Sequence, residues 1–206
     1  MSVNIISVGD KKILEYFRMF PERAALAMQM AINTVTTRSG MSLAKKSMLN
    51  EIAFPSGYLN ADRLKVTKKA TKTNLEATIT GRKRATSLAR FVTSGTVVNS
   101  RRREGLAVRV KRGKTTYLKN AFLVRLNKGA SLSEDNFNVG LAVRLSAGES
   151  LANKRSQHKS WLVPNKVALL YAPSVDQVFS SVADKVGPKI ADMVATEFFR
   201  NFGRLS

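Results

Sequence analysis

Three tracts rich in arginine and lysine are the candidate binding residues of this chain. They comprise Arg82, Lys83 and Arg84; Arg101, Arg102 and Arg103; and Arg109, Lys111, Arg112 and Lys114. Guanidinium groups bind phosphate through paired hydrogen bonds and ammonium groups bind it as point charges. The tracts therefore predict contact with DNA or with an acidic protein partner, and a solvated surface is the alternative interpretation.

Residue types that support catalysis are scarce. The chain has no cysteine and a single histidine, His158, which excludes thiolate chemistry and sites with several histidines. The neighbours Glu134 and Asp135 stand in a Gly/Ser-rich stretch, where a solvated role is expected. Gly113, Lys114 and Thr115 resemble only a fragment of a phosphate-binding loop. We expect no catalytic, cofactor-binding or metal-binding residue, and no enzyme.

The net charge of the chain is concentrated in its middle third. The 206 residues contain 35 Lys and Arg against 14 Asp and Glu, a net charge of +21. Residues 61–130 account for 19 of the basic and 3 of the acidic residues, or +16. With 44% hydrophobic residues the chain has enough apolar material for a core. The charge therefore belongs to a folded body that needs an anionic partner.

The middle third has the alternating pattern of half-buried strands. Apolar residues alternate with polar ones over 64–66, 75–80, 106–110, 122–126 and 139–145. Lys65, Arg109, Lys111 and Arg125 occupy the polar positions, and residues 112–114 provide the turn of a hairpin. This pattern predicts an antiparallel sheet with a cationic face.

Both ends of the chain have helical periodicity. Apolar residues recur at steps of three and four from Pro21 to Ile52, with a break or bend near Gly40, and a shorter helix is expected over 11–20. At the other end Ser174 and Gln177 have the spacing of a capping box. The following stripe crosses Gly187 and Pro188, which predicts one kinked helix or two consecutive ones.

These elements predict an α+β fold with a central antiparallel β-sheet flanked by long N-terminal and C-terminal helices. We expect a single domain over residues 1–206. It would contain an N-terminal helical part (1–60), a basic β-sheet part (61–145), a flexible loop (146–160), and a strand with the C-terminal helix (161–206). No signal peptide and no stretch of about 18 apolar residues is evident, so a cytosol-like compartment is expected.

A series of segments, in this order, resembles the minor tail protein Z family of bacteriophages, the lambda-type tail-completion or neck proteins. The C-terminal segment that includes Tyr171, Pro173 and Ser174 resembles the family's "YGPS"-type motif, with Ala172 in place of glycine. The other segments are 31–33, 36–38, 63–66, 69–71, 74–79, 81–82, Leu88 with Phe91, 107–111 and 121–122. The similarity in order covers residues 20–202.

The resemblance implies a virion structural protein that completes the head-proximal end of the tail and helps to join tail to head. Such a protein assembles in the host cytoplasm as a homo-oligomeric ring, by analogy a hexamer. Its expected partners are further copies of itself, the tail tube or tail terminator protein, the head–tail connector proteins, and phage DNA in the lumen. A membrane partner and a cofactor are not expected.

The sequence is also compatible with two other functions. A free-standing basic nucleic-acid-binding protein would also carry tracts of Arg and Lys, and it would bind bulk DNA as a purified monomer with a steep dependence on salt. An enzyme of unknown type is the third and least supported alternative. Ring formation on a tail end would distinguish the tail-completion protein from both.

Overall fold

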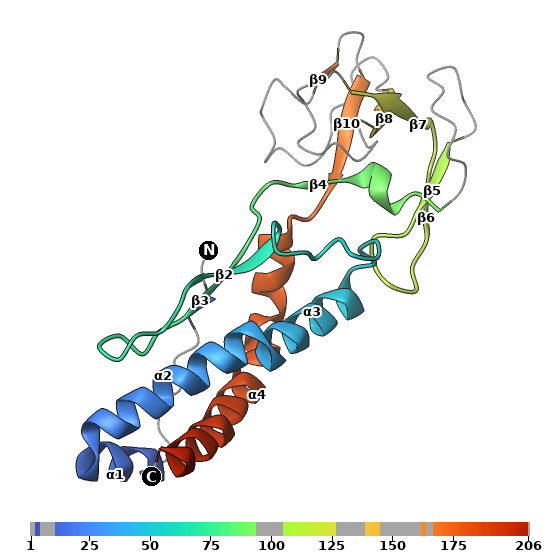
Figure 1. Ribbon diagram of the computed structural model, residues 1–206. Helices are drawn as coiled ribbons and strands as arrows, with labels where there is room; N and C mark the ends of the chain where they lie inside the picture. Colours follow the sequence, from blue (N-terminus) through green and yellow to red (C-terminus); the bar gives the residue numbers. More distant parts are fainter. Residues whose placement is uncertain are drawn as a thin grey trace. The chain divides into compact units, whose positions relative to one another are not determined.

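The computed structural model describes residues 3–4, 11–93, 105–126, 139–144, 162–163 and 167–205. The described chain has the predicted α+β fold, with helices at both ends and antiparallel strands between them (Figure 1). The predicted loop over 146–160, together with Arg101, Arg102, Arg103, Glu134, Asp135 and His158, lies outside the described residues.

The chain divides into two compact units. The helical unit consists of Met1–Glu51, Ser56–Arg84 and Ser174–Ser206, and the sheet unit consists of Ile52–Pro55 and Ala85–Pro173. Each unit is therefore built from segments that are distant in the sequence, and the strands of the middle third fall into both units. The four α-helices found in the described residues all belong to the helical unit.

The N-terminal half of the helical unit contains three consecutive helices. They are α1 (Lys11–Met19), α2 (Pro21–Thr37) and α3 (Ser39–Glu51). Pro21 is the first residue of α2, where its missing N–H and restricted φ fit a helix start. The predicted break occurs at Arg38, whose φ of −117° and ψ of −93° interrupt the helical path. Gly40 follows as a buried residue of α3.

The C-terminal helix α4 (Val175–Arg204) is one continuous helix. The Gln177 backbone N–H donates to Ser174 Oγ at 3.1 Å, and the Ser174 N–H donates to Gln177 Oε1 at 2.9 Å, which confirms the predicted capping box. Pro188 lies inside the helix and removes one backbone hydrogen bond. Figure 1 shows α4 changing direction along its length, so of the two predicted alternatives, one kinked helix or two consecutive helices, the structure has the first.

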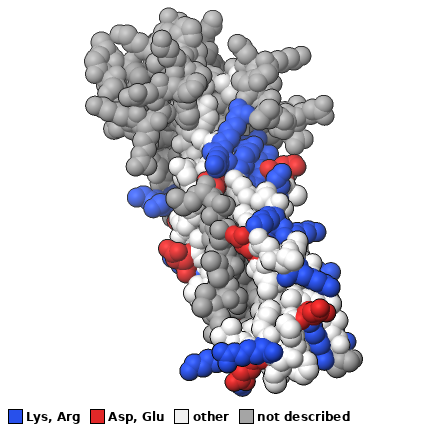
Figure 2. Space-filling view, turned by 90° about the vertical axis from the view of Figure 1, so that its left-hand side faces the viewer, with Lys and Arg blue, Asp and Glu red and all other residues white. Residues whose placement is uncertain are grey.

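The outer surface of the helical unit mixes charges of both signs. Its described segments contain 19 basic and 9 acidic residues, and ion pairs join Lys68 to Glu76 and Arg200 to Glu197. In the view of Figure 2, acidic side chains lie among basic ones on the described surface. Surface pairs of this kind contribute little stability, about 0–1 kcal/mol each.

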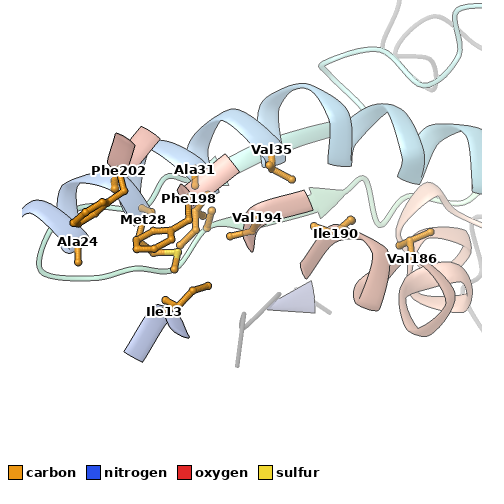
Figure 3. Close-up of a cluster of buried hydrophobic side chains, with 14 residues drawn as sticks. Ile13, Ala24, Met28, Ala31, Val35, Val186, Ile190, Val194, Phe198 and Phe202 are labelled. Carbon is orange, nitrogen blue, oxygen red and sulfur yellow. The ribbon is translucent and has the colours of Figure 1, made fainter. Parts of the chain in front are cut away.

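The main apolar core lies between α2 and α4. Ala24, Met28, Ala31 and Val35 of α2 face a stripe of α4 side chains that ends at Phe198 and Phe202, and Ile13 of α1 closes one side (Figure 3). Small alanines on α2 leave room for the large rings of α4, and Phe198 is fully buried. The rings of Tyr16 and Phe17 on α1 also contact Phe198.

A small sheet packs beside these helices. It has the order β1 (Val3–Asn4), β3 (Thr78–Gly81) and β2 (Leu64–Lys68), and all its pairs are antiparallel. Leu64 and Ile79 are buried, whereas Lys65 and Thr67 are exposed. The Asn33 side chain of α2 bonds both backbone groups of Ala70, its Nδ2 donating to the carbonyl at 2.9 Å and its Oδ1 accepting from the N–H at 2.8 Å. This pair of bonds fastens the β2–β3 connection to α2.

The sheet unit contains two further antiparallel sheets. The larger has the order β4 (Thr86–Ser87), β10 (Val167–Ala172), β8 (Val139–Arg144) and β7 (Ala121–Arg125), with β9 (Leu162–Val163) also paired to β10. The smaller is a hairpin of β5 (Leu106–Val108) and β6 (Thr116–Leu118). A 3₁₀ turn, η1, spans Leu88–Phe91. The predicted antiparallel strands are thus present but belong to three sheets.

Candidate polyanion-binding surface

The third predicted tract lies in the hairpin of β5 and β6. This hairpin, residues 105–120, is called the basic hairpin below. Its strands pair Leu106 with Leu118 and Val108 with Thr116. The turn is closed by the Lys114 N–H, which donates to the Lys111 carbonyl at 3.2 Å. Gly113 has a φ of +78°, which suits the third residue of a type II turn, where glycine is favoured.

The root of the basic hairpin is fixed by apolar burial and backbone bonds within the sheet unit. Leu106 and Val108 are 2% and 3% exposed. The Arg109 N–H donates to the Phe91 carbonyl at 2.8 Å, and the Ala53 N–H donates to the Val110 carbonyl at 2.8 Å. Lys111, the first residue of the turn, also forms an antiparallel bridge with Ile52, so the sheet unit supports the backbone of the hairpin as far as its turn.

The tip presents cations to solvent. Arg109, Lys111, Arg112 and Lys114 are all exposed, and so is Lys119, which follows β6. The neighbouring exposed side chains are those of Thr115, Thr116 and Tyr117, and the Arg109 Nε–H donates to Thr115 Oγ1 at 3.3 Å. The aliphatic residues within 109–120, Val110 and Leu118, are half-buried. The surface of the tip thus offers hydrogen-bond donors and positive charge rather than apolar area.

The sheet unit has an unbalanced charge. Its described segments contain eight Lys and Arg residues and no Asp or Glu, whereas the described segments of the helical unit contain 19 and 9. The eight are Arg90, Arg109, Lys111, Arg112, Lys114, Lys119, Arg125 and Arg144. In the full sequence the segments of the sheet unit contain 16 Lys and Arg against 4 Asp and Glu, so the unit as a whole also has a large positive excess.

The first predicted tract is placed differently. Arg82 is half-buried in the helical unit, where its Nη2 donates to Tyr58 Oη at 3.0 Å. Its backbone N–H donates to the Arg63 carbonyl at 2.7 Å and its carbonyl accepts from the Asp176 N–H at 3.2 Å. Lys83 and Arg84 are exposed. Arg82 therefore positions β3 against the start of α4.

The family-like segment forms the junction of β10 and α4. Tyr171 pairs with Ser87 of β4 and is 36% exposed, whereas Ser174 is 3% exposed and caps α4. Pro173 is exposed and separates the strand from the capping residue. The boundary between the two units falls between Pro173 and Ser174. These residues thus shape the chain where it leaves the sheet unit.

Two features of the basic hairpin were not predicted from the sequence. The ring of Tyr117 lies over Gly105, since a Cβ at Gly105 would stand 2.8 Å from Tyr117 Oη, and Gly105 has a φ of +75°. Lys119 adds an exposed cation at the open end of the hairpin, opposite the turn. Its sequence signal is the Lys119-Asn120 pair between two strand-like runs, because Asn tolerates the φ of 62° seen at Asn120.

Groups of three or more metal-ligating side chains are absent from the part of the chain that the structure describes. Within the same residues, none of the helices has the length and apolar character needed to cross a membrane. Comparison of the chain with protein-family models, with curated proteins and with solved structures returned no match.

Proposed function

We propose that this chain is a structural protein of a tailed bacteriophage that completes the head-proximal end of the tail and helps to join tail to head. It would act without catalysis, as a ring of identical subunits around the path of the DNA. The resemblance to the minor tail protein Z family supplies the proposal, through the order of its segments over residues 20–202. The partners would be further copies of the chain, tail tube or terminator proteins and connector proteins.

The observation that carries the proposal furthest is the charge of the sheet unit, whose residues 52–55 and 85–173 contain 16 Lys and Arg against 4 Asp and Glu, a net charge of +12. Identical subunits with this charge repel one another when they are brought together in a ring. A ring becomes stable when a polyanion or an acidic neighbour opposes the charge. DNA in the lumen and acidic rings above or below would each meet this requirement.

The junction at Pro173 and Ser174 is compatible with the same proposal. The family-like residues there include a buried capping serine and an exposed proline, both of which define how a strand passes into a helix. Because this motif shapes the connection between a strand and a helix, we expect proteins with the same architecture to share it even when their partners differ.

The proposal is tested by imaging particles assembled without this protein. We expect tails that fail to join heads or that lack a finished head-proximal end, and a ring of density at the neck that returns when the protein is supplied. Normal joined virions in its absence would contradict the proposal.

A second experiment addresses the tract at Arg101, Arg102 and Arg103. Reversal of these three charges is expected to reduce infectivity through defective joining or DNA positioning, while the helical circular dichroism of the purified protein is unchanged. Unaltered infectivity would show that this tract is only a solvated surface.

A free-standing nucleic-acid-binding protein is the second candidate, and the exposed cations of the basic hairpin favour it. Specific DNA-binding proteins reach dissociation constants of about 10⁻⁸–10⁻¹¹ M at physiological salt, whereas non-specific electrostatic binding lies near 10⁻⁴–10⁻⁶ M. The tail protein would bind in the weaker range as a monomer. Nanomolar binding of one preferred sequence by the purified monomer would favour the second candidate.

A further inference from the structure

We infer that the basic hairpin binds the phosphate backbone of duplex DNA without reading the base sequence. This inference depends on the proposed function only for the place in the particle where the protein contacts DNA. The ligand itself is inferred from the side chains of the hairpin. Its elements are five exposed cations on a supported two-stranded ribbon, namely Arg109, Lys111, Arg112, Lys114 and Lys119.

The exposed chemistry of the tip fits phosphate better than it fits a folded protein. Protein interfaces have an apolar centre enriched in aromatic and methionine side chains and depleted of lysine. The segment from Arg109 to Thr116 exposes two lysines, two arginines and two threonines, and a third exposed lysine, Lys119, lies at the open end of the hairpin, while Val110 and Leu118 are half-buried. Interfaces with DNA are polar and positively charged, and Arg, Lys, Thr and Tyr side chains supply their phosphate contacts.

Tyr117 adds an exposed hydroxyl donor at the open end of the hairpin, beside Gly105. It is 62% exposed, and its ring lies over Gly105, where only a glycine leaves space for it. The ring is thereby held close to the backbone of the hairpin root. A phenol in this position can donate to a phosphate oxygen, as threonine hydroxyls do.

The composition of the hairpin argues against sequence recognition. Asn, Gln, Asp and Glu are the side chains that read adenine and cytosine edges, and the only one of them in the basic hairpin is Asn120, which lies at its open end in the turn after β6 and not at residues 109–116. A two-stranded ribbon can enter a major groove, but this one would bring only Arg and Lys, which also bind phosphate. The expected interaction is therefore electrostatic and independent of sequence.

The number of cations sets the size of the salt effect. Each neutralised phosphate of duplex DNA adds about −0.9 to the slope of log K against log salt concentration, so five contacts correspond to about −4.5. Between 50 and 200 mM salt this slope lowers the affinity roughly 500-fold. Removal of three contacts would leave a slope of about −1.8 and a loss of only about 12-fold.

The experiment compares two triple variants of the full-length protein that lose the same charge. One is K111Q/K114Q/K119Q in the basic hairpin, and the matched control is K65Q/K69Q/K72Q in the helical unit, where the three lysines are also exposed. Binding to a fluorescein-labelled 20-base-pair duplex is followed by anisotropy from 50 to 200 mM NaCl. The double variant K111Q/K114Q serves if the triple variant loses its native circular dichroism.

We expect the hairpin triple variant to lower the magnitude of the slope by about 2.7 and the double variant by about 1.8, with no change in the control. Two duplexes of different sequence should bind equally. Equal losses in the hairpin and control variants would overturn the inference, as would a tenfold preference for one duplex. Binding to polyglutamate with the same dependence on the hairpin lysines, in place of DNA, would assign the surface to an acidic protein.

The outcomes separate this inference from the proposed function. If the hairpin variant binds DNA like the unaltered protein while imaging still places the protein at the neck, the tail function stands and the hairpin inference fails. If the hairpin lysines control DNA binding but particles without the protein are normal, the inference stands and the proposed function fails.

Discussion

Replacement of Gly81 by alanine tests the contact between β3 and the start of α4. A Cβ at Gly81 would stand 2.7 Å from Asp176 Cα, 2.8 Å from the Asp176 nitrogen and 3.0 Å from the Val175 carbonyl carbon. All three are backbone atoms, so no flexible side chain can move aside. The strand or the helix must shift, and the hydrogen bond from the Asp176 N–H to the Arg82 carbonyl lies at the same contact.

The expected cost is set by two opposing terms. Overpacking in a well-packed site costs about 1–3 kcal/mol. Loss of glycine's freedom in the unfolded chain returns about 0.4–1 kcal/mol, because the φ of Gly81 is not positive and alanine can adopt it. The central values of these ranges, about 2 and about 0.7 kcal/mol, leave a net loss of about 1.3 kcal/mol in the free energy of unfolding for Gly81→Ala.

Urea unfolding followed by circular dichroism at 222 nm measures this change, because all four α-helices belong to the helical unit. With a slope near 2 kcal/mol per molar urea, the midpoint should fall by about 0.5–1 M. The matched control is Gly203→Ala in the last turn of α4, where an added Cβ meets nothing within 4 Å. This control should gain up to about 1 kcal/mol. An unchanged or higher midpoint for Gly81→Ala would refute the close approach of β3 to α4.

Three further changes probe the helical unit, each by urea unfolding at 222 nm. Ser174→Ala removes the cap of α4 and should cost about 1 kcal/mol, while Ser174→Asp should retain most of the stability; equal losses would contradict the capping role. Asn33→Ala leaves the partly buried backbone groups of Ala70 without their partner and should cost about 1–3 kcal/mol, so a neutral result would show that water replaces the amide. Phe198→Ala empties a fully buried site and should cost about 3–5 kcal/mol, whereas Phe20→Ala, at 47% exposure, should cost far less; similar losses would refute the placement of the core.

Local signals in the sequence were sufficient to predict the helices. The cap at Ser174, the proline at Pro21 and the apolar stripes act over a few residues, so their physics is complete within a short window. The turn at Gly113 was predictable for the same reason. These features agree between the sequence and the structure.

Long-range pairing and partial burial could not be predicted in this way. β10 pairs with β4 and β8, so its partners depend on how the whole sheet unit closes, and the sequence pattern alone does not distinguish one sheet from three. Arg82 belongs to a basic tract, and nothing in the neighbouring sequence distinguishes it from an exposed arginine. Its side chain nevertheless donates to Tyr58 and is half-buried. The charge of a residue is visible in a sequence, but its burial depends on the tertiary contacts around it.

The arrangement of α2 and α4 around one core has a consequence for synthesis on the ribosome. The apolar face of α2, from Ala24 to Val35, is complete early, but its cover from Val186 to Phe202 follows about 150 residues later. At about 5–20 residues per second the face waits roughly 8–30 s for its partner. During this interval the nascent chain exposes a long apolar stripe. When α4 then packs on α2, it closes a loop that includes residues 85–173, at an entropy cost of about 4 kcal/mol. Shielding of the nascent α2 face by a chaperone would therefore raise the yield of folded subunits.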